Sequence, residues 1–120
     1  MKGIFVNQTN CSRYADLIAN GYKTIETRSR NMLSALVGER VAIVRTMSGK
    51  NPLVIGYVDI VGSVYSKDKT AADYPECTFV PDTSKFANNR WFYLLRNPER
   101  CEAFPLPSSA IRHGRSWCEF

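Results

Sequence analysis

The segment from Leu53 to Tyr65 constrains the fold more than any other part of the sequence. It reads LVIGYVDIVGSVY, and its valines, isoleucines and tyrosines are residue types that favour β-strands. Gly56 and Gly62 interrupt the run, and glycine inside a strand is typical of a bulge or a bend. The segment therefore predicts a bent strand of the kind that a closing barrel needs.

Further strands are predicted on both sides of this run. Before it come Gly3–Val6 and Glu39–Thr46, and the turn-forming residues SGKNP join the second of these to Leu53. After it, RWFYLLRN predicts a strand, CEAFPLP an edge strand because of its prolines, and GRSWCEF a closing strand. The polar stretch Ser66–Asn89 predicts a long excursion with a turn or two of helix, and such excursions are often functional.

One amphipathic helix is predicted within NQTNCSRYADLIANG. Thr9 or Asn10 can cap its start, and Gly21 can adopt the left-handed conformation after its end. Its apolar stripe at helical spacing consists of Cys11, Tyr14, Leu17 and Ile18.

Length and composition indicate one globular domain over residues 1–120. The chain is 44% hydrophobic and 12% aromatic, which is typical of a foldable protein, and it is too short for a second core. One early helix followed by about six short strands predicts an α+β fold, a small and mostly antiparallel β-barrel with helices at its ends.

The net charge and the cysteine pattern indicate which partners and cofactors the chain can bind. The formal net charge of +5, from 16 Lys and Arg against 11 Asp and Glu, favours a polyanionic partner. The four cysteines form no CxxC pair and do not cluster with His113, so we expect no metal site and no cofactor. We expect no targeting peptide and no membrane span, and hence a cytoplasmic protein with reduced thiols.

The segment GYKTIETRS, residues 21–29, places three charged side chains inside a β-pattern. In a strand, Thr24, Glu26 and Arg28 share one face, and Ile25 and Thr27 share the other. We therefore expect Ile25 to point into the barrel. Lys23 has the parity of Ile25, so it reaches Glu26 only from a turn after Gly21, and the turn is our prediction. The alternative from spacing alone is an exposed Glu26–Arg28 ion pair beside a solvated Lys23.

The same segment resembles the GxKxxExR signature of ASCH domains, small barrels related to the PUA superfamily. Gly21, Lys23, Glu26 and Arg28 occupy all four signature positions. The resemblance continues in YADLIANG before the motif, in LVGERVAIV after it, and in the pattern of Trp91, NP, PLP and HGRSW towards the end.

The resemblance implies a PUA-like barrel with a cleft, lined by the motif, that accepts RNA or a nucleotide-like ligand. Arg28 could bind phosphate or a base edge, Lys23 could act as a point charge on phosphate, and Glu26 could accept from an exocyclic amine or hold Arg28 in place. Ser29 and Arg30 extend this polar set. Trp91, Tyr93 and Trp117 are candidates for stacking on bases, although large aromatic residues in small barrels are more often part of the core.

An enzymatic alternative comes from small ASCH-like amidohydrolases that act on acylated cytidine nucleosides with a Lys, a Thr and a carboxylate. Lys23 fits that lysine, but Glu26 stands where those enzymes are thought to have threonine. The catalytic set would then be Lys23, Glu26 and Thr24, or Thr27 in place of Thr24, with Asp73 or Glu76 as a further carboxylate.

Two other functions rank below these. A ribonuclease would lack the usual histidine pair, because His113 is the only histidine and is expected in a solvated loop. A protein-interaction domain would need Trp91 or Phe104 exposed in an apolar patch. Glu26 at the threonine position makes binding of RNA, a nucleotide or a nucleoside the favoured function. The sequence leaves the oligomeric state open.

Overall fold

A computed structural model describes all residues from 1 to 120. Seven strands form one sheet in the order β2-β5-β4-β3-β1-β7-β6. Only β1 and β3 pair in parallel, and every other pair of neighbours is antiparallel. The strands are β1 (Lys2–Asn7), β2 (Ile25–Arg28), β3 (Arg40–Thr46), β4 (Leu53–Tyr65), β5 (Trp91–Pro105), β6 (Ile111–His113) and β7 (Trp117–Glu119).

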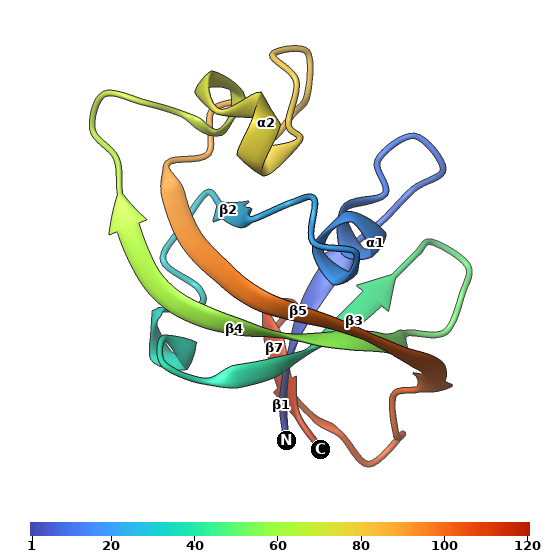
Figure 1. Cartoon of the computed structure of the whole chain (residues 1–120). Helices are drawn as coiled ribbons and strands as arrows, with labels where there is room; N and C mark the ends of the chain where they lie inside the picture. The colour runs from blue at the N-terminus through green and yellow to red at the C-terminus, as the bar shows by residue number, and fades with distance from the viewer.

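Strands β4 and β5 are long and curl across the whole molecule (Figure 1). Their pairing contains register shifts, including those between Val54 and Gly56 and between Ile60 and Gly62. The predicted strand Leu53–Tyr65 and its irregularities at both glycines are thus confirmed. At Gly56 the backbone of Glu99 approaches so closely that a Cβ atom would overlap its carbonyl oxygen.

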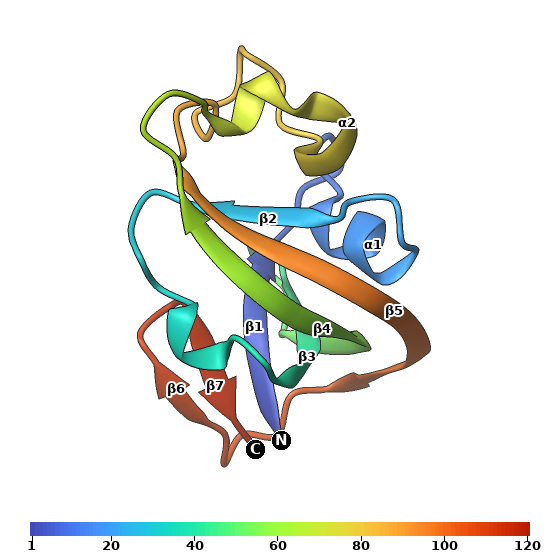
Figure 2. The same cartoon turned by 60° about the vertical axis from the view of Figure 1, so that its left-hand side comes forward.

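The expected closed barrel of about six strands is not what the chain forms. The sheet is curled but open, with β2 and β6 as its edges (Figure 2). The strand count differs for two reasons. The residues of CEAFPLP up to Pro105 continue β5 instead of forming a separate edge strand, and Ile111–His113 adds the short β6, which pairs with β7.

The helices are short. Helix α1 (Tyr14–Ala19) begins later than expected, because Thr9 accepts hydrogen bonds from Cys11 and Ser12 in a separate turn and does not cap the helix. Cys11 is therefore exposed and outside the helix. The predicted excursion contains the 3-10 helix η2 (Ala71–Asp73) and helix α2 (Pro75–Thr78), which packs against β2 (Figure 1). A further 3-10 helix, η1 (Ser34–Leu36), precedes β3.

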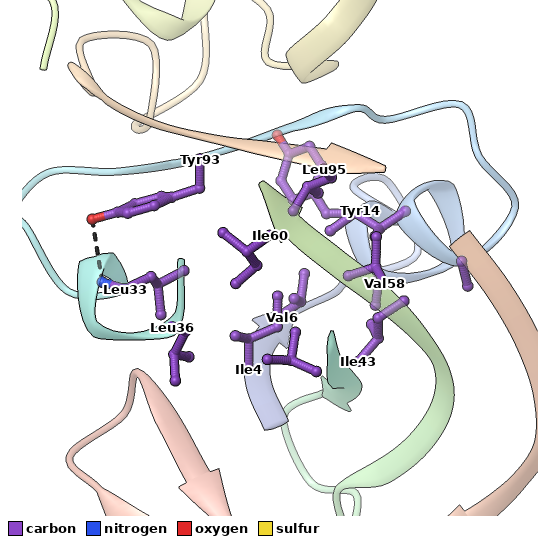
Figure 3. Close-up of a cluster of buried hydrophobic side chains, with 14 of the residues drawn as sticks. Ile4, Val6, Tyr14, Leu33, Leu36, Ile43, Val58, Ile60, Tyr93 and Leu95 are labelled. Carbon is purple, nitrogen blue, oxygen red and sulfur yellow. Dashed lines mark hydrogen bonds between the residues drawn. The ribbon is translucent and has the colours of Figure 1, made fainter. Parts of the chain in front are cut away.

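The main core lies inside the curl of the sheet (Figure 3). It joins α1 to the inner faces of the strands through residues such as Ile4, Ile18, Ile43 and Ile60. The Tyr93 hydroxyl accepts hydrogen bonds from the backbone amides of Met32 (3.0 Å) and Leu33 (3.2 Å), and so secures the segment that follows β2. A smaller cluster around Phe5, Val44 and Val54 packs on the other face of the sheet.

None of the helices is long and apolar enough to cross a membrane.

Candidate functional site

The start of the charged motif is shaped by the end of α1. Gly21 has a φ of 85°, as expected for a left-handed residue after a helix, and the amides of Tyr22 and Lys23 both donate to the Leu17 carbonyl. Lys23 therefore lies in the turn before β2 and not in the strand, as its parity predicts. From this turn its ammonium comes within 3.6 Å of Glu26 Oε1.

The side chain of Ile25 lies on the outer face of β2, although we expected it to point into the interior. Glu26 lies opposite Tyr93, a core residue, so Glu26 and Arg28 point towards the interior. Ile25 lies opposite Leu94 and lines a shallow groove of about 370 Å³ on the outer side of β2, β5 and β4. Alternation correctly placed Glu26 and Arg28 on one face, although Thr27 lines the cleft with them. Apolarity was a wrong guide to which face is inner, because the inner side chains of β2 line a polar cleft.

Lys23, Glu26 and Arg28 form one buried network. Lys23 is 2% exposed and Glu26 is 7% exposed. Glu26 Oε1 accepts from the Thr27 amide at 3.0 Å, and Glu26 Oε2 lies 3.2 Å from Arg28 Nη2. The Lys23 ammonium donates to the Thr78 carbonyl of α2 and lies 5.0 Å from the centre of the Tyr14 ring. The alternative of a solvated Lys23 beside an exposed ion pair is therefore wrong.

Burial and the neighbouring opposite charges shift the pKa values of Lys23 and Glu26 in opposite directions. Burial lowers the pKa of Lys23, because the ammonium is removed from water, and nearby Glu26 only partly offsets this. For Glu26, burial alone would raise the pKa, but Lys23, Arg28 and the hydrogen bond from the Thr27 amide together outweigh it and hold the pKa below its ordinary value. Glu26 is thus ionised at neutral pH.

The network forms the floor of a cleft of about 900 Å³. The cleft lies between β1 and the edge strand β2, and the excursion and the β6–β7 hairpin supply its other walls. Its lining includes Phe5, Asn7, Tyr14, Lys23, Glu26, Thr27, Arg28, Ser29, Met32, Lys85, Phe86, Asn89, Arg112, Arg115 and Ser116.

Positive charge dominates this lining. Lys23, Arg28, Lys85, Arg112 and Arg115 contribute cations, and Glu26 is the single carboxylate. The Arg112 guanidinium lies over the Phe5 ring at 5.3 Å, and the Lys85 ammonium over the Phe86 ring at 5.1 Å. The cleft therefore attracts anions.

The remaining predicted binding residues divide into two groups. Ser29 lines the cleft, whereas the exposed Arg30 and the half-buried Thr24 do not. None of the three aromatic candidates lines it either. Tyr93 is fully buried, Trp91 packs against the core and the Tyr65 ring, and Trp117 stacks on His113 with ring centres 3.8 Å apart.

The residues invoked for the other functions lie away from the cleft. Asp73 caps η2 by accepting from the Thr70 amide, and Glu76 is exposed on α2. His113 lies in β6 and not in a loop, where it bonds Glu119 at 2.8 Å. Phe104 is partly buried against the smaller core cluster. No group of three or more His, Cys, Asp or Glu side chains is placed to hold a metal ion.

Sequence reasoning missed Lys85, Asn89, Arg112 and Arg115 as cleft residues. Asn89 donates to the Thr27 hydroxyl at 3.3 Å, which ties the end of the excursion to β2. The available signal was the basic RHGR segment, residues 112–115, which adds two arginines to a chain of net positive charge.

Comparison with solved structures finds crystal structures of an ASCH protein from Zymomonas mobilis. A serine-to-alanine variant matches with a TM-score of 0.66 and 19% identity over 96% of this chain and 85% of that one. The unsubstituted protein gives a TM-score of 0.62 and 22% identity over 87% and 73% of the two chains. A tyrosine-to-phenylalanine variant gives 0.61 and 23% over 88% and 77%.

The chain has the ASCH-domain fold. Comparison of its sequence with protein-family models and with curated proteins gives no match. The ASCH assignment therefore depends on the fold.

Proposed function

We propose that the cleft of this ASCH fold binds RNA or a nucleotide. The observation that carries the proposal is the excess of five cationic side chains over one carboxylate in a single cleft. Phosphate groups supply most of the electrostatic attraction of proteins for nucleic acids, so a cleft of this charge suits a phosphorylated ligand.

The shape and chemistry of the cleft also suit a base. Phe86 is half-buried on its wall, where its ring meets Tyr14 edge-on at 6.4 Å, and an aromatic ring that lines such a cleft can stack on a base. Only Nη2 of Arg28 bonds within the protein, to Glu26 and to the Phe5 carbonyl. The other guanidinium donors can therefore bind an acceptor on a base edge.

The proposal is tested by a thermal-shift screen of nucleosides, nucleotides and short single-stranded RNAs at low salt. A ligand present at about 100 times its dissociation constant stabilises the folded state by about 2.7 kcal/mol, which is easily detected. Binding should weaken as salt rises. The absence of binding to every member of the screen would refute the proposal.

Deacylation of a modified cytidine nucleoside is the second candidate, and one observation favours it. Burial lowers the pKa of Lys23, which brings its amine closer to acting as a base. Two observations speak against it. Lys23 hydrogen-bonds no threonine hydroxyl, and Glu26 is the single carboxylate in the cleft and is occupied by two cations.

Incubation with an N-acylated cytidine separates the two candidates. Turnover that is lost in Lys23→Met would establish the hydrolase. Stabilisation by the nucleoside without turnover would establish a binding module, and we expect this second result.

A further inference from the structure

The charged side chains on the floor of the cleft are paired with one another, whereas those on its exposed rim are not. The floor consists of Lys23, Glu26 and Arg28, and the rim of Lys85, Arg112 and Arg115. On the floor, Glu26 engages both Lys23 and Arg28, and Lys23 also bonds the Thr78 carbonyl. A phosphate placed there would approach the buried carboxylate of Glu26 and compete with it for both cations. Like charges in a desolvated site repel strongly, so the floor favours a neutral polar group over a phosphate.

The rim carries cations with no such partner. No carboxylate lies within 4.0 Å of Lys85, Arg112 or Arg115, whereas Lys23 and Arg28 on the floor both lie within that distance of Glu26. Arg112 and Arg115 make no hydrogen bond within the protein through their side chains, so their planar donors remain available.

The β6–β7 hairpin holds its two arginines at the cleft. Gly114, with a φ of 59°, forms the tight turn between them. The Ser116 carbonyl accepts from the Phe5 amide of β1 at 3.1 Å, and the Trp117 ring stacks on His113. Glu119, the carboxylate of the hairpin, is bonded to His113 and so does not neutralise either arginine. The hairpin thus presents unpaired guanidinium groups from an ordered scaffold.

We propose that Arg112 and Arg115 form the phosphate-binding site of the cleft, with Lys85 on the opposite wall, while the Lys23–Glu26–Arg28 floor receives the base. This inference rests on the proposed function, because it assigns parts of one nucleotide to parts of the same cleft. It differs from the expectation that the motif residues Lys23 and Arg28 bind the phosphate. Guanidinium forks match phosphate oxygens in bidentate geometry, which suits this role.

The test compares three sets of ligands: the four common ribonucleosides, their 5′-monophosphates, and the corresponding dinucleotides with one phosphodiester. The site variant is Arg112→Gln with Arg115→Gln. The control variant is Lys50→Gln with Arg96→Gln, two exposed residues outside the cleft. Each pair of changes removes two positive charges, from +5 to +3, so the two variants have the same formal net charge.

We expect the site variant to lose about tenfold or more in affinity for the phosphorylated ligands, because charge-assisted hydrogen bonds are lost. Its affinity for nucleosides should stay within about twofold of wild type, as should every affinity of the control variant, since distant surface charges are screened. The slope of the logarithm of dinucleotide affinity against the logarithm of salt concentration should also become less steep, by about one for each lost phosphate contact.

Two results would overturn the inference and leave the proposed function intact. One is that the site and control variants lose the same affinity for phosphorylated ligands. The other is that the site variant loses as much affinity for nucleosides as for monophosphates. If the wild-type protein binds none of the three sets, the proposed function fails and this inference fails with it. If the site variant loses affinity for the monophosphates alone, Arg112 and Arg115 bind a terminal phosphate. If it loses affinity for the dinucleotides as well, they also bind a phosphodiester.

Discussion

Arg28, on the edge strand β2, donates a hydrogen bond of 2.7 Å to the backbone carbonyl of Phe5 on β1. These strands stand at the first and fifth places in the sheet, so the curl brings one edge back to a distant strand. Because β1 already pairs with β3 and β7, a side chain and not a backbone ladder joins β2 to it. Phe5 and Arg28 both line the cleft at this point.

We predict that Arg28→Ala destabilises the protein by about 3 kcal/mol, because it leaves the buried Glu26 with one cation fewer and the Phe5 carbonyl without its donor. Urea unfolding measures the effect. The exposed Arg30, two residues later, is the control, and Arg30→Ala should change the free energy of unfolding by less than about 0.5 kcal/mol. Equal effects at the two positions would contradict the role of Arg28.

Glu26 should contribute to the acid limb of the stability curve. Its pKa in the folded state lies below the ordinary value of 4.5, so the unfolded chain takes up its proton first as the pH falls. The stabilisation is complete above 4.5 and is lost as the pH falls through the folded-state pKa. The difference in unfolding free energy between wild type and Glu26→Gln should therefore shrink at acid pH. Glu76→Gln, at an exposed position outside any ion pair, should show no such trend.

Two glycines of β4 should respond differently to the same substitution. A Cβ on Gly56 would overlap the Glu99 carbonyl, whereas a Cβ on Gly62 would meet only the Leu94 side chain at 3.4 Å. Gly56→Ala should destabilise the protein by about 2 kcal/mol and Gly62→Ala by less than about 1 kcal/mol. Thermal unfolding of both variants gives the comparison, and a tolerated alanine at position 56 would show that β4 and β5 can separate there.

Tyr93→Phe should loosen the segment between β2 and η1. The lost hydroxyl leaves the amides of Met32 and Leu33 without their acceptor, at a cost of about 1–3 kcal/mol. Hydrogen exchange at those two amides should accelerate. Tyr65→Phe serves as the control, because the Tyr65 hydroxyl has no hydrogen-bond partner in the protein and its side chain is half exposed.

If a base stacks in the cleft, Phe86 is the ring that we expect to receive it. Phe86→Leu keeps an apolar side chain but removes the flat surface, and should weaken RNA binding by about 1–3 kcal/mol. Trp91→Leu, at a ring outside the cleft lining, should leave the affinity unchanged. Titration of a labelled single-stranded RNA measures both. The reverse ranking would return the stacking role to Trp91.

Local signals predicted most of the strands and the end of the helix, but not the start of the helix. Leu53–Tyr65 could be assigned to its terminal residues, because β-branched composition and turn residues mark both ends. The motif GYKTIETRS also placed Lys23 in the turn that Gly21 permits, since side-chain parity excluded the strand. These features depend on a few neighbouring residues.

Features that depend on distant residues could not be predicted in the same way. The inner face of β2 is polar because Phe5 and the hairpin Arg112–Ser116 meet it in space, and nothing near Ile25 in the sequence reports this. The two strands expected over RWFYLLRN and CEAFPLP are one, because the register shifts of β5 against β4 accommodate Pro98 without ending the strand. The open sheet likewise follows from the pairing partners and not from any single strand.

The pairings around the cleft also determine when it can form during folding. β2 becomes a strand only by joining β5, with Ile25 opposite Leu94, and the hairpin wall depends on β7 joining β1, with Trp117 opposite Ile4. Contacts so far apart in sequence form slowly, because a long loop must close before they gain any energy. During synthesis, the floor must therefore wait for β5 and the rim for β7, and the charges of β2 remain hydrated until β5 has been made.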